Sequence, residues 1–411
     1  MLRVLVIRFS YVPLVVVYSV RSIIAWVKSL SSNPRTFISE PHLGQPILLL
    51  AVWEKGELRP DIVRLLRSAK NQGMYTFVIN TARLTDPPNI AAYVDHYIER
   101  VNFGADFGSY KLGFEWILNP AKVQSTPRVI MGNDSVFYIS DRIESTLNAH
   151  INATHEVLGI TENFEYHYHL GSFFISFSEA IRTHPSLKKF WKKYHRSQMR
   201  PRNIRLGEMA LTKCLLRCVS KREALDSQIN VRVLRATLEQ TPESVPTFLD
   251  HLSSTGLMNE VKEIPTPGEV IRKIFTFFSP SKSSDMGPIR TQTQASKLPE
   301  NFLDTFEFTS GVDFSRAPQQ FKDFATGMVL HTFTLDSQIH NSALSTMLLG
   351  IPIIKNDLLY RGAMGSYEAV KLMRMLPEPD RTEFSKMLFD RPYGGDTLHG
   401  WKLLAFCNGL I

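Results

Sequence analysis

The chain has 411 residues, of which 44% are hydrophobic and 21% are charged. This composition excludes a mostly disordered protein, and at roughly 150 residues per domain the length predicts two to three domains. The 47 Lys and Arg residues outnumber the 39 Asp and Glu residues, which gives a formal net charge of +8 at pH 7. The excess of positive charge predicts anionic partners, a class that includes nucleotides, nucleic acids and acidic membrane surfaces.

Residues 1–45 form an apolar and basic N-terminal segment. Basic residues interrupt its apolar run, so it lacks the about 20 uninterrupted apolar residues of a spanning helix. These residues are Arg3, Arg8, Arg21 and Lys28, and no acidic residue precedes Glu40. We therefore expect an element that lies in the interface of an anionic membrane surface. The alternative is a strand and a helix packed against the rest of the protein.

Residues 46–220 have the pattern of an α/β domain. The sequence PILLLAVWEKGEL predicts a buried strand, residues 59–72 have helical periodicity, and MYTFVIN predicts a second strand. This succession is a βαβ unit and therefore predicts a parallel sheet. Two further strands are expected within residues 96–101 and 128–139. Loops that follow such strands are where doubly wound sheets bind ligands.

The remaining chain divides into three parts. We expect a helical extension at residues 221–275, because the pattern from 186 to 257 is mainly helical. Residues 276–300 are rich in Ser, Thr, Pro and Gln, which is typical of a flexible linker or loop. Residues 301–411 contain an apolar helical stretch and the short strand IPIIK. We expect this C-terminal segment either to complete the site or to pack on the core.

A glycine-rich motif, RVNFGADFGSYKLG, contains Arg100, Asn102, Asp106 and Lys111. Closely spaced glycines let backbone amides approach a ligand, and the basic side chains can neutralise phosphate. Asp106 can accept a hydrogen bond from a base or a ribose. The alternative is a turn that needs glycine only for its backbone conformation.

A second motif, GNDSVFY, places Asn133 and Asp134 at or near the end of an apolar strand. A carboxylate and an amide oxygen there could hold a divalent cation, Mg²⁺ or Mn²⁺, that bridges a diphosphate. An Asn-Asp pair is also common in ordinary turns, and that alternative stays open.

A third motif, ENFEYHYHLGSFFISF, contains Glu165 and His169 ahead of an aromatic strand. Either side chain could be tuned toward neutral pH and act as a general base on an acceptor hydroxyl. A structural, hydrogen-bonded histidine is the alternative.

Aromatic residues alternate with basic ones in the sequence KKFWKKYHRSQMRPRNIR, which contains no acidic residue. Such a stretch could bind single-stranded nucleic acid, an anionic bilayer or a polyprenyl-diphosphate acceptor. A solvated basic helix face is the commonest structure for such a run.

In this order, the motifs resemble the rhamnan synthesis protein F family of bacterial cell-surface polysaccharide glycosyltransferases. The residues that carry the resemblance lie between Ile47 and Cys218: LLLAVWEKGEL, VINTAR, the R-x-N-x-G-x-DFGSYK motif, NDSV, the HLGSFFISF segment, FW and GEMALT. A weaker similarity covers GIPIIKNDLL near the C-terminus. The sequence departs from the family at Trp53-Glu54, where an aromatic residue followed by Asp is usual, and at Gly171, where Gln is expected.

The resemblance implies a GT-A-like nucleotide-sugar-binding fold and a role for each motif. Asp134 would bind the metal or the sugar phosphate and take part in catalysis, and Glu165 or His169 would act as the base. The donor-binding residues would be Val52, Asn80, Arg100, Asn102, Asp106, Lys111 and Asn133. Asn341 and Lys355 would belong to an acceptor or C-terminal site. The donor would be a dTDP-, UDP- or GDP-sugar.

We therefore expect a glycosyltransferase that moves a sugar such as rhamnose from a nucleotide-sugar donor to a polysaccharide or lipid-linked acceptor. The resemblance implies an inverting enzyme of the hexosyltransferase class. We expect it in the cytoplasm, peripheral on the inner face of the cell membrane. Two alternatives stay open. One is a catalytically inactive relative in polysaccharide assembly, which the Trp53-Glu54 departure favours. The other is a basic nucleic-acid-binding protein, but nucleic acid is the less favoured class of partner.

Overall fold

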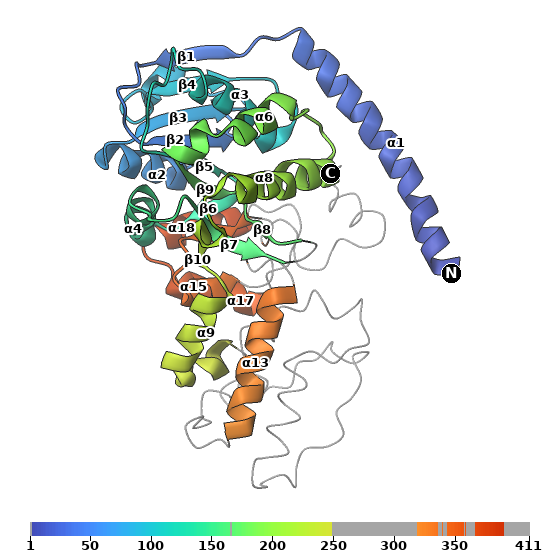
Figure 1. Ribbon diagram of the computed structural model, residues 1–411, viewed down its shortest axis with the longest axis vertical. Coiled ribbons are helices and arrows are strands. Elements are labelled where there is room, and N and C mark those ends of the chain that lie inside the picture. The colour runs from blue at the N-terminus through green and yellow to red at the C-terminus, as the bar shows by residue number, and fades with distance from the viewer. Residues whose placement is uncertain are drawn as a thin grey trace.

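The computed structural model describes residues 2–164, 167–248, 319–335, 339, 343–356, 358 and 366–389. Their central feature is a sheet with the strand order β1-β4-β3-β2-β5-β9-β7-β10, to which β8 adds by pairing with β7 (Figure 1). The strands are β1 (Arg35–Ser39), β2 (Ile47–Val52), β3 (Tyr75–Asn80), β4 (His96–Glu99), β5 (Arg128–Asn133), β7 (Val157–Asn163), β8 (His169–Leu170), β9 (Phe174–Ser178) and β10 (Leu225–Ile229).

Most strands of this sheet run in one direction. β2 is parallel to both β3 and β5, β3 is parallel to β4, and β7 is parallel to β10. β9 lies antiparallel between β5 and β7, and β1 lies antiparallel on the edge next to β4. The sequence prediction of a mixed α/β fold with a parallel sheet is therefore confirmed.

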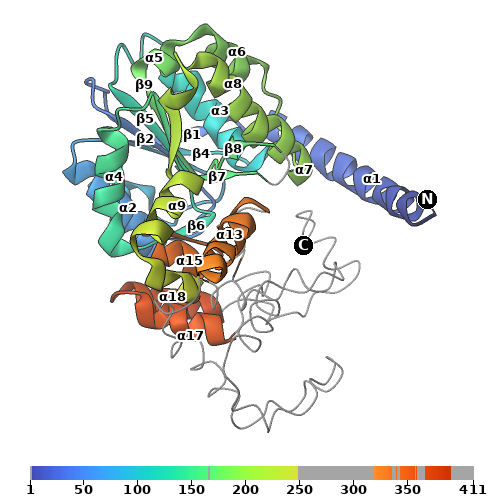
Figure 2. The same ribbon diagram turned by 60° about the horizontal axis from the view of Figure 1, so that its bottom comes forward.

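Helices cover both faces of the sheet because its central strands are apolar on both faces. In β2, Leu48 and Leu50 pack in one apolar cluster, and Leu49 packs in the other. The first face carries α2 (Pro60–Asn71), α4 (Ser140–Ile151), α9 (Val231–Gln240) and α13 (Gln319–Leu335). The second face carries α3 (Ala105–Ile117), α6 (Pro185–Lys193) and α8 (Ala210–Cys218), as Figure 2 shows.

Short elements complete this domain: η1 (Pro87–Ile90), α5 (Glu179–Thr183), α7 (Arg200–Asn203), η2 (Ile204–Met209), η3 (Arg222–Ala224) and η4 (Pro242–Ser244). The N-terminal helix α1 (Leu2–Leu30) extends away from the rest of the molecule in Figure 1. Within the described ranges, none of the helices has both the length and the apolar character needed to cross a membrane.

The C-terminal segment packs on the core beside β5. Its strand β11 (Ile353–Lys355) pairs antiparallel with β6 (Val136–Tyr138), which follows β5 directly. Three helices surround this two-stranded sheet: α15 (Ala343–Leu348), α17 (Ser366–Met375) and α18 (Asp380–Phe389). They enclose a third apolar cluster that includes Phe137 and Phe384. The strand that follows Asn133 and Asp134 is thus bound to the last third of the chain.

A charged network joins α2 to α18. The Arg64 guanidinium donates at 2.6 and 2.7 Å to the carboxylate of Glu383 and at 2.7 Å to that of Asp380. The buried Asp380 carboxylate also accepts from the backbone N–H of Ser140, at the start of α4. A single buried carboxylate therefore connects two core helices to the C-terminal segment.

Within the predicted helical extension at residues 221–275, the described residues 221–248 contain α9 and also one strand. Residues 225–229 form β10, the last strand of the central sheet, so the sheet continues past the predicted boundary at residue 220. The strand has the period-2 pattern of a half-buried strand, with Leu225, Ser227 and Ile229 buried. Its polar composition, LDSQI, disguised that pattern in the sequence. The predicted linker at 276–300 lies outside the described residues.

Replacing Arg64 by Met should destabilise the protein by about 1.5–3 kcal/mol, because the buried Asp380 carboxylate loses a charged donor. Urea denaturation measures the loss. The matched control is Arg235→Met: Arg235 pairs with Glu239 on an exposed helix surface, and such pairs contribute about 0.5 kcal/mol. Equal effects of the two substitutions would contradict the attachment of α18 through Arg64.

Candidate functional site

The strand order of the sheet reverses direction at β2. The chain passes from β2 through α2 to β3 on one side, and after β4 it returns through α3 to β5 on the other side. In open α/β sheets, ligands bind in the crevice outside the carboxyl ends of the strands at such a point. Here those carboxyl ends are the segment after Val52 and the Asn133-Asp134 pair.

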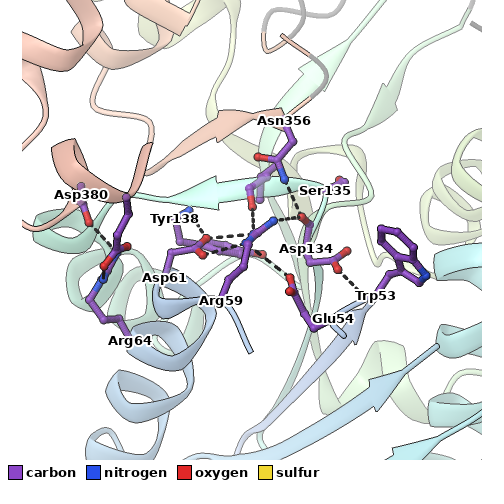
Figure 3. Close-up of polar contacts among 12 residues, drawn as sticks. Trp53, Glu54, Arg59, Asp61, Arg64, Asp134, Ser135, Tyr138, Asn356 and Asp380 are labelled. Atoms are coloured by element: carbon purple, nitrogen blue, oxygen red, sulfur yellow. Dashed lines mark hydrogen bonds and ion pairs between the residues drawn. The ribbon is translucent and has the colours of Figure 1, made fainter. Parts of the chain in front are cut away.

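Asp134 follows β5 and is bound from three directions (Figure 3). Its carboxylate accepts from the backbone N–H of Trp53, and its backbone carbonyl accepts from Arg59 Nη1 at 3.1 Å and from Asn356 Nδ2 at 2.9 Å. Burial raises the pKa of the Asp134 carboxyl above its ordinary value. The loop after β2, the start of α2 and the C-terminal segment therefore all meet at this residue.

The Asn133 side chain connects Asp134 to the glycine-rich motif and to the C-terminal segment. Asn133 Nδ2 donates to Asp106 Oδ2 at 2.9 Å, and Asn133 Oδ1 accepts from Ser135 Oγ at 2.6 Å. Ser135 Oγ in turn accepts from Lys355 Nζ at 2.8 Å. Four of the residues predicted for the site, Asp106, Asn133, Asp134 and Lys355, thus form one group.

Charges and burial both act on Asp106. The pKa of its carboxyl is raised to about 6, mainly by burial and also by the charges of Asp134 and Glu208, against the opposing effect of Lys355 and Arg100. Glu208 lies in the GEMALT motif, where its carboxylate accepts from the backbone N–H of Ser172. The sequence pattern does not identify Glu208 as a site residue, although its motif belongs to the resemblance.

The loop after β2 presents a large aromatic side chain to solvent. Trp53 is 67% exposed, while its neighbour Glu54 is buried. Burial raises the pKa of Glu54 to about 8, against the opposing effect of Arg59, whose Nε lies 3.5 Å from the carboxylate. A flat, exposed indole at the end of a central strand is suited to stack on a ring of a bound ligand.

Two residues that were predicted to bind the donor, Asn80 and Val52, hold the loop after β2 in position through hydrogen bonds. Asn80 is fully buried, and its amide exchanges hydrogen bonds with the backbone N–H and carbonyl of Glu54. The carbonyl of Val52 accepts from the backbone N–H of Thr81. Both residues therefore position the Trp53 loop, and direct contact with a ligand stays a prediction.

Arg59 stabilises the same corner of the site. Its guanidinium binds Asp61 with two hydrogen bonds of 3.0 and 3.1 Å and also donates to the carbonyl of Val136 at 2.8 Å. Asp61 accepts from the backbone N–H of Tyr138, in β6. The attractive charges around the Arg59 guanidinium raise its pKa, so it stays charged.

Two basic residues that were predicted to bind a ligand, Arg100 and Lys111, contact other parts of the protein. Arg100 is buried, and its guanidinium donates to Ser109 Oγ and to three backbone carbonyls of residues 101–105. Lys111 donates to the carbonyl of Trp191 in α6 and pairs with Glu115. These contacts lie within the protein, and the predicted contacts of both side chains with a nucleotide stay untested.

The chain is strained between Arg100 and Asp106. Gly104 and Ala105 have φ values of 93° and 46°, and the left-handed region is costly for alanine. Gly108 leaves room for the Arg100 guanidinium, since a Cβ there would lie 2.8 Å from its Nη2. The exposed Asn102 accepts through its backbone carbonyl from Gln198. This strained loop places Asp106 within hydrogen-bonding distance of Asn133.

Of the two predicted bases, His169 lies among the described residues and Glu165 does not. His169 is buried in β8, where its Nδ1 lies 2.7 Å from the carbonyl of His167. Glu165 lies outside the described residues, as does Asn341 of the predicted C-terminal site. The roles of all three stay predictions.

The aromatic residues of the basic stretch belong to the core. Trp191 and Tyr194 are buried against α3, and Phe190 is half-buried beside them. They offer no exposed rings on which nucleobases could stack. The stretch therefore presents its cations rather than these rings to solvent, and the nucleic-acid alternative stays untested.

The described residues include no group of three or more His, Cys, Asp or Glu side chains arranged to hold a metal ion. Mg²⁺ is often bound through one or two carboxylates together with substrate phosphates, so a divalent cation does not need such a group. Asp134 is partly exposed and fits this mode as a single protein ligand.

Comparisons with known proteins give little further evidence. No protein-family model matches the chain, and no curated protein matches it. The structure is similar to that of the glycosyltransferase GlyE from Streptococcus pneumoniae TIGR4, with 10% sequence identity and a TM-score of 0.25. The match covers 69% of this chain and 64% of that chain. The resemblance to the rhamnan synthesis protein F family stays a prediction.

Replacing Asp106 by Asn should stabilise the protein, but only at higher pH. The pKa of Asp106 rises from 3.8 to about 6, so above pH 6 the folded protein must bury a charge that the unfolded chain exposes to water. Wild-type stability therefore falls as pH rises through this range. We expect equal stability near pH 3.5 and a gain for Asp106→Asn of about 1–3 kcal/mol above pH 7, measured by urea denaturation.

A second variant separates this effect from general acid sensitivity. Glu54→Gln should also gain stability with rising pH, but its gain should continue to develop up to about pH 8, following the higher pKa of Glu54. If either difference were independent of pH, the corresponding carboxyl would not be a buried, titrating group.

Proposed function

We propose that the protein is a glycosyltransferase that uses a nucleotide-sugar donor. The observation that carries the proposal is the group Asp106, Asn133, Asp134 and Lys355 at the switch point of the sheet, beside the exposed Trp53. A doubly wound sheet binds nucleotides at this position. The order of the motifs along the sequence, which resembles the rhamnan synthesis protein F family, supports the same activity.

In this proposal each side chain has a distinct role. Lys355 supplies a positive charge for the donor diphosphate from the C-terminal segment, and Trp53 stacks on a ring of the donor. Asp134 accepts from a hydroxyl group of the sugar, or would hold a cation that bridges to the phosphate, through the carboxylate oxygen that does not bind Trp53. Asn133 fixes the orientation of Asp106 through their hydrogen bond.

The reaction forms a bond between an acceptor hydroxyl oxygen and the anomeric carbon of the sugar. The bond from that carbon to the diphosphate oxygen breaks, and the nucleoside diphosphate leaves with the electron pair. A base takes the hydroxyl proton. Asp106 has a pKa of about 6, which suits proton transfer near neutral pH, so it joins Glu165 and His169 as a candidate.

A divalent cation, Mg²⁺ or Mn²⁺, would be held by Asp134 and would neutralise charge on the departing diphosphate. Preorganised positive charge at the leaving group is usually a large part of the rate enhancement in such transfers. Lys355 supplies part of this charge from the protein itself.

The finer assignments rest on the resemblance. They are a GT-A-like fold, a dTDP-, UDP- or GDP-sugar donor, inversion at the anomeric carbon, and a cell-surface polysaccharide or lipid-linked acceptor, with rhamnose as one candidate sugar. The Trp53-Glu54 departure keeps one alternative open, namely an inactive relative that binds a nucleotide sugar without transferring it.

Thermal unfolding against a panel of UDP-, GDP-, CMP- and dTDP-sugars, with and without Mg²⁺ or Mn²⁺, tests the donor site. A ligand that binds only the folded protein must raise the melting temperature. We expect one nucleotide class to raise it selectively. The absence of any shift for folded protein would overturn the proposal.

Asp134→Asn should reduce transfer about 100-fold or more while the fold stays intact, since Asn can still accept from the Trp53 N–H. The assay is sugar release or transfer from the donor identified above. The control Asp141→Asn removes the same charge from an exposed position on α4 and should retain activity. Near-normal turnover of Asp134→Asn would contradict its assignment, and binding without turnover in the wild type would favour the inactive relative.

Lys355→Met should weaken donor binding about tenfold or more, because the diphosphate loses a charge-assisted contact. Titration calorimetry measures the affinity. Lys386→Met, on the exposed surface of α18, is the matched control and should bind as the wild type does. Unchanged affinity in Lys355→Met would remove Lys355 from the donor site.

A further inference from the structure

The outer face of α1 is apolar, and the side chains on the face toward the protein are small or carry a hydroxyl group. Among residues 16–30, the buried and half-buried positions include Tyr18, Ser22, Ala25 and Ser29, whose spacing defines one side of a helix. The apolar side chains on the remaining surface are between 46% and 64% exposed: Val16, Val17, Val20, Ile23, Ile24, Trp26, Val27 and Leu30. A surface helix of a water-soluble fold has the opposite arrangement.

A hydrogen bond brings α1 next to a strongly basic segment. Ser22 Oγ accepts from the backbone N–H of Gln198 at 3.3 Å, in the loop between α6 and α7 (Figure 2). Seven basic side chains of residues 185–205 are exposed: Lys188, Lys189, Lys192, Lys193, Arg196, Arg202 and Arg205. Exposed apolar and exposed basic side chains therefore adjoin one another.

The charge of this surface has one sign. Neither residues 16–30 nor residues 185–205 contain an Asp or Glu, whereas both contain Lys and Arg. A soluble protein partner of ordinary composition would not need so many exposed aliphatic side chains beside exposed cations. An anionic bilayer matches both properties, because its headgroups attract Lys and Arg and its acyl boundary accepts aliphatic side chains.

We propose that the outer face of α1 and the basic residues of 185–205 form one surface that binds an anionic lipid bilayer. The helix lies in the plane of the interface with Ile23, Ile24 and Val27 in the acyl boundary. The lysines of α6 contact the headgroups. This inference does not depend on the proposed enzymatic activity, and an inactive relative would bind in the same way.

Flotation of the full chain with vesicles tests the surface. We expect binding to phosphatidylcholine vesicles that contain 30% phosphatidylglycerol, and binding at least about tenfold weaker to pure phosphatidylcholine. Ile23→Asn with Ile24→Asn should reduce binding to the anionic vesicles about tenfold or more. Val233→Asn with Val370→Asn is the control, since these exposed apolar residues lie on α9 and α17.

Two triple variants test the electrostatic contribution to vesicle binding. Lys189→Gln, Lys192→Gln and Lys193→Gln together should weaken binding about tenfold and reduce its dependence on salt. Lys122→Gln, Lys221→Gln and Lys386→Gln remove the same charge from exposed positions outside the segment and should have little effect. Equal losses in the two triple variants would show attraction by net charge alone and would overturn the proposed surface.

Tryptophan fluorescence reports the depth of α1 directly. Brominated lipids should quench the emission of Trp26, so quenching should be lost in Trp26→Phe and retained in Trp53→Phe, which removes another exposed tryptophan. The absence of vesicle binding by folded protein would overturn the proposal. A dimer that dissociates in the Ile23→Asn, Ile24→Asn variant, without vesicle binding by the wild type, would assign the same face to a second copy of the chain.

Discussion

The candidate site depends on one constraint: the peptide that follows β5 must be bound from every side if Asp134 is to stay at the carboxyl end of the sheet. Arg59 and Asn356 bind the carbonyl of this residue, and the backbone of Trp53 binds its carboxylate. These partners come from α2, from the C-terminal segment and from the loop after β2. An isolated carboxylate at this depth would cost several kcal/mol and would tend to stay protonated. The surrounding donors offset that cost and also fix the geometry.

The same constraint extends to other polar residues near the site, which make hydrogen bonds within the protein. The Asn80 amide forms hydrogen bonds with the backbone of the loop after β2. The Arg100 guanidinium donates to backbone carbonyls of the loop that precedes Asp106. A reactive group that is held by loops needs such a second layer, because loops alone do not position side chains accurately. The unusual features of the region, a buried Glu54 and the left-handed Ala105, are concentrated within this layer.

Much of the fold could be predicted from the sequence because its central strands are continuous apolar runs. The βαβ unit at residues 47–80 and the Asn133-Asp134 pair at the end of a strand both follow from local patterns. β10 was missed because its buried face includes a serine. For Arg100 and Lys111, the sequence shows cations near glycines but not the backbone carbonyls that they contact, and their role toward a ligand stays a prediction. Glu208 was missed because only tertiary packing brings it toward Asp106.

The pairing of β6 with β11 has a consequence for how the protein acquires its shape. Lys355 and Ser135 are 220 residues apart in the chain, and the hydrogen bond between them is among the most distant contacts of the fold. Closing a loop of that length costs little more free energy than closing one half as long, but such contacts form slowly. During synthesis from the N-terminus, the sheet from β1 to β10 can assemble while the last third of the chain is still being made. The central sheet can therefore form before the candidate site does. At that stage most of the fold is present, but Lys355 has not yet reached Ser135.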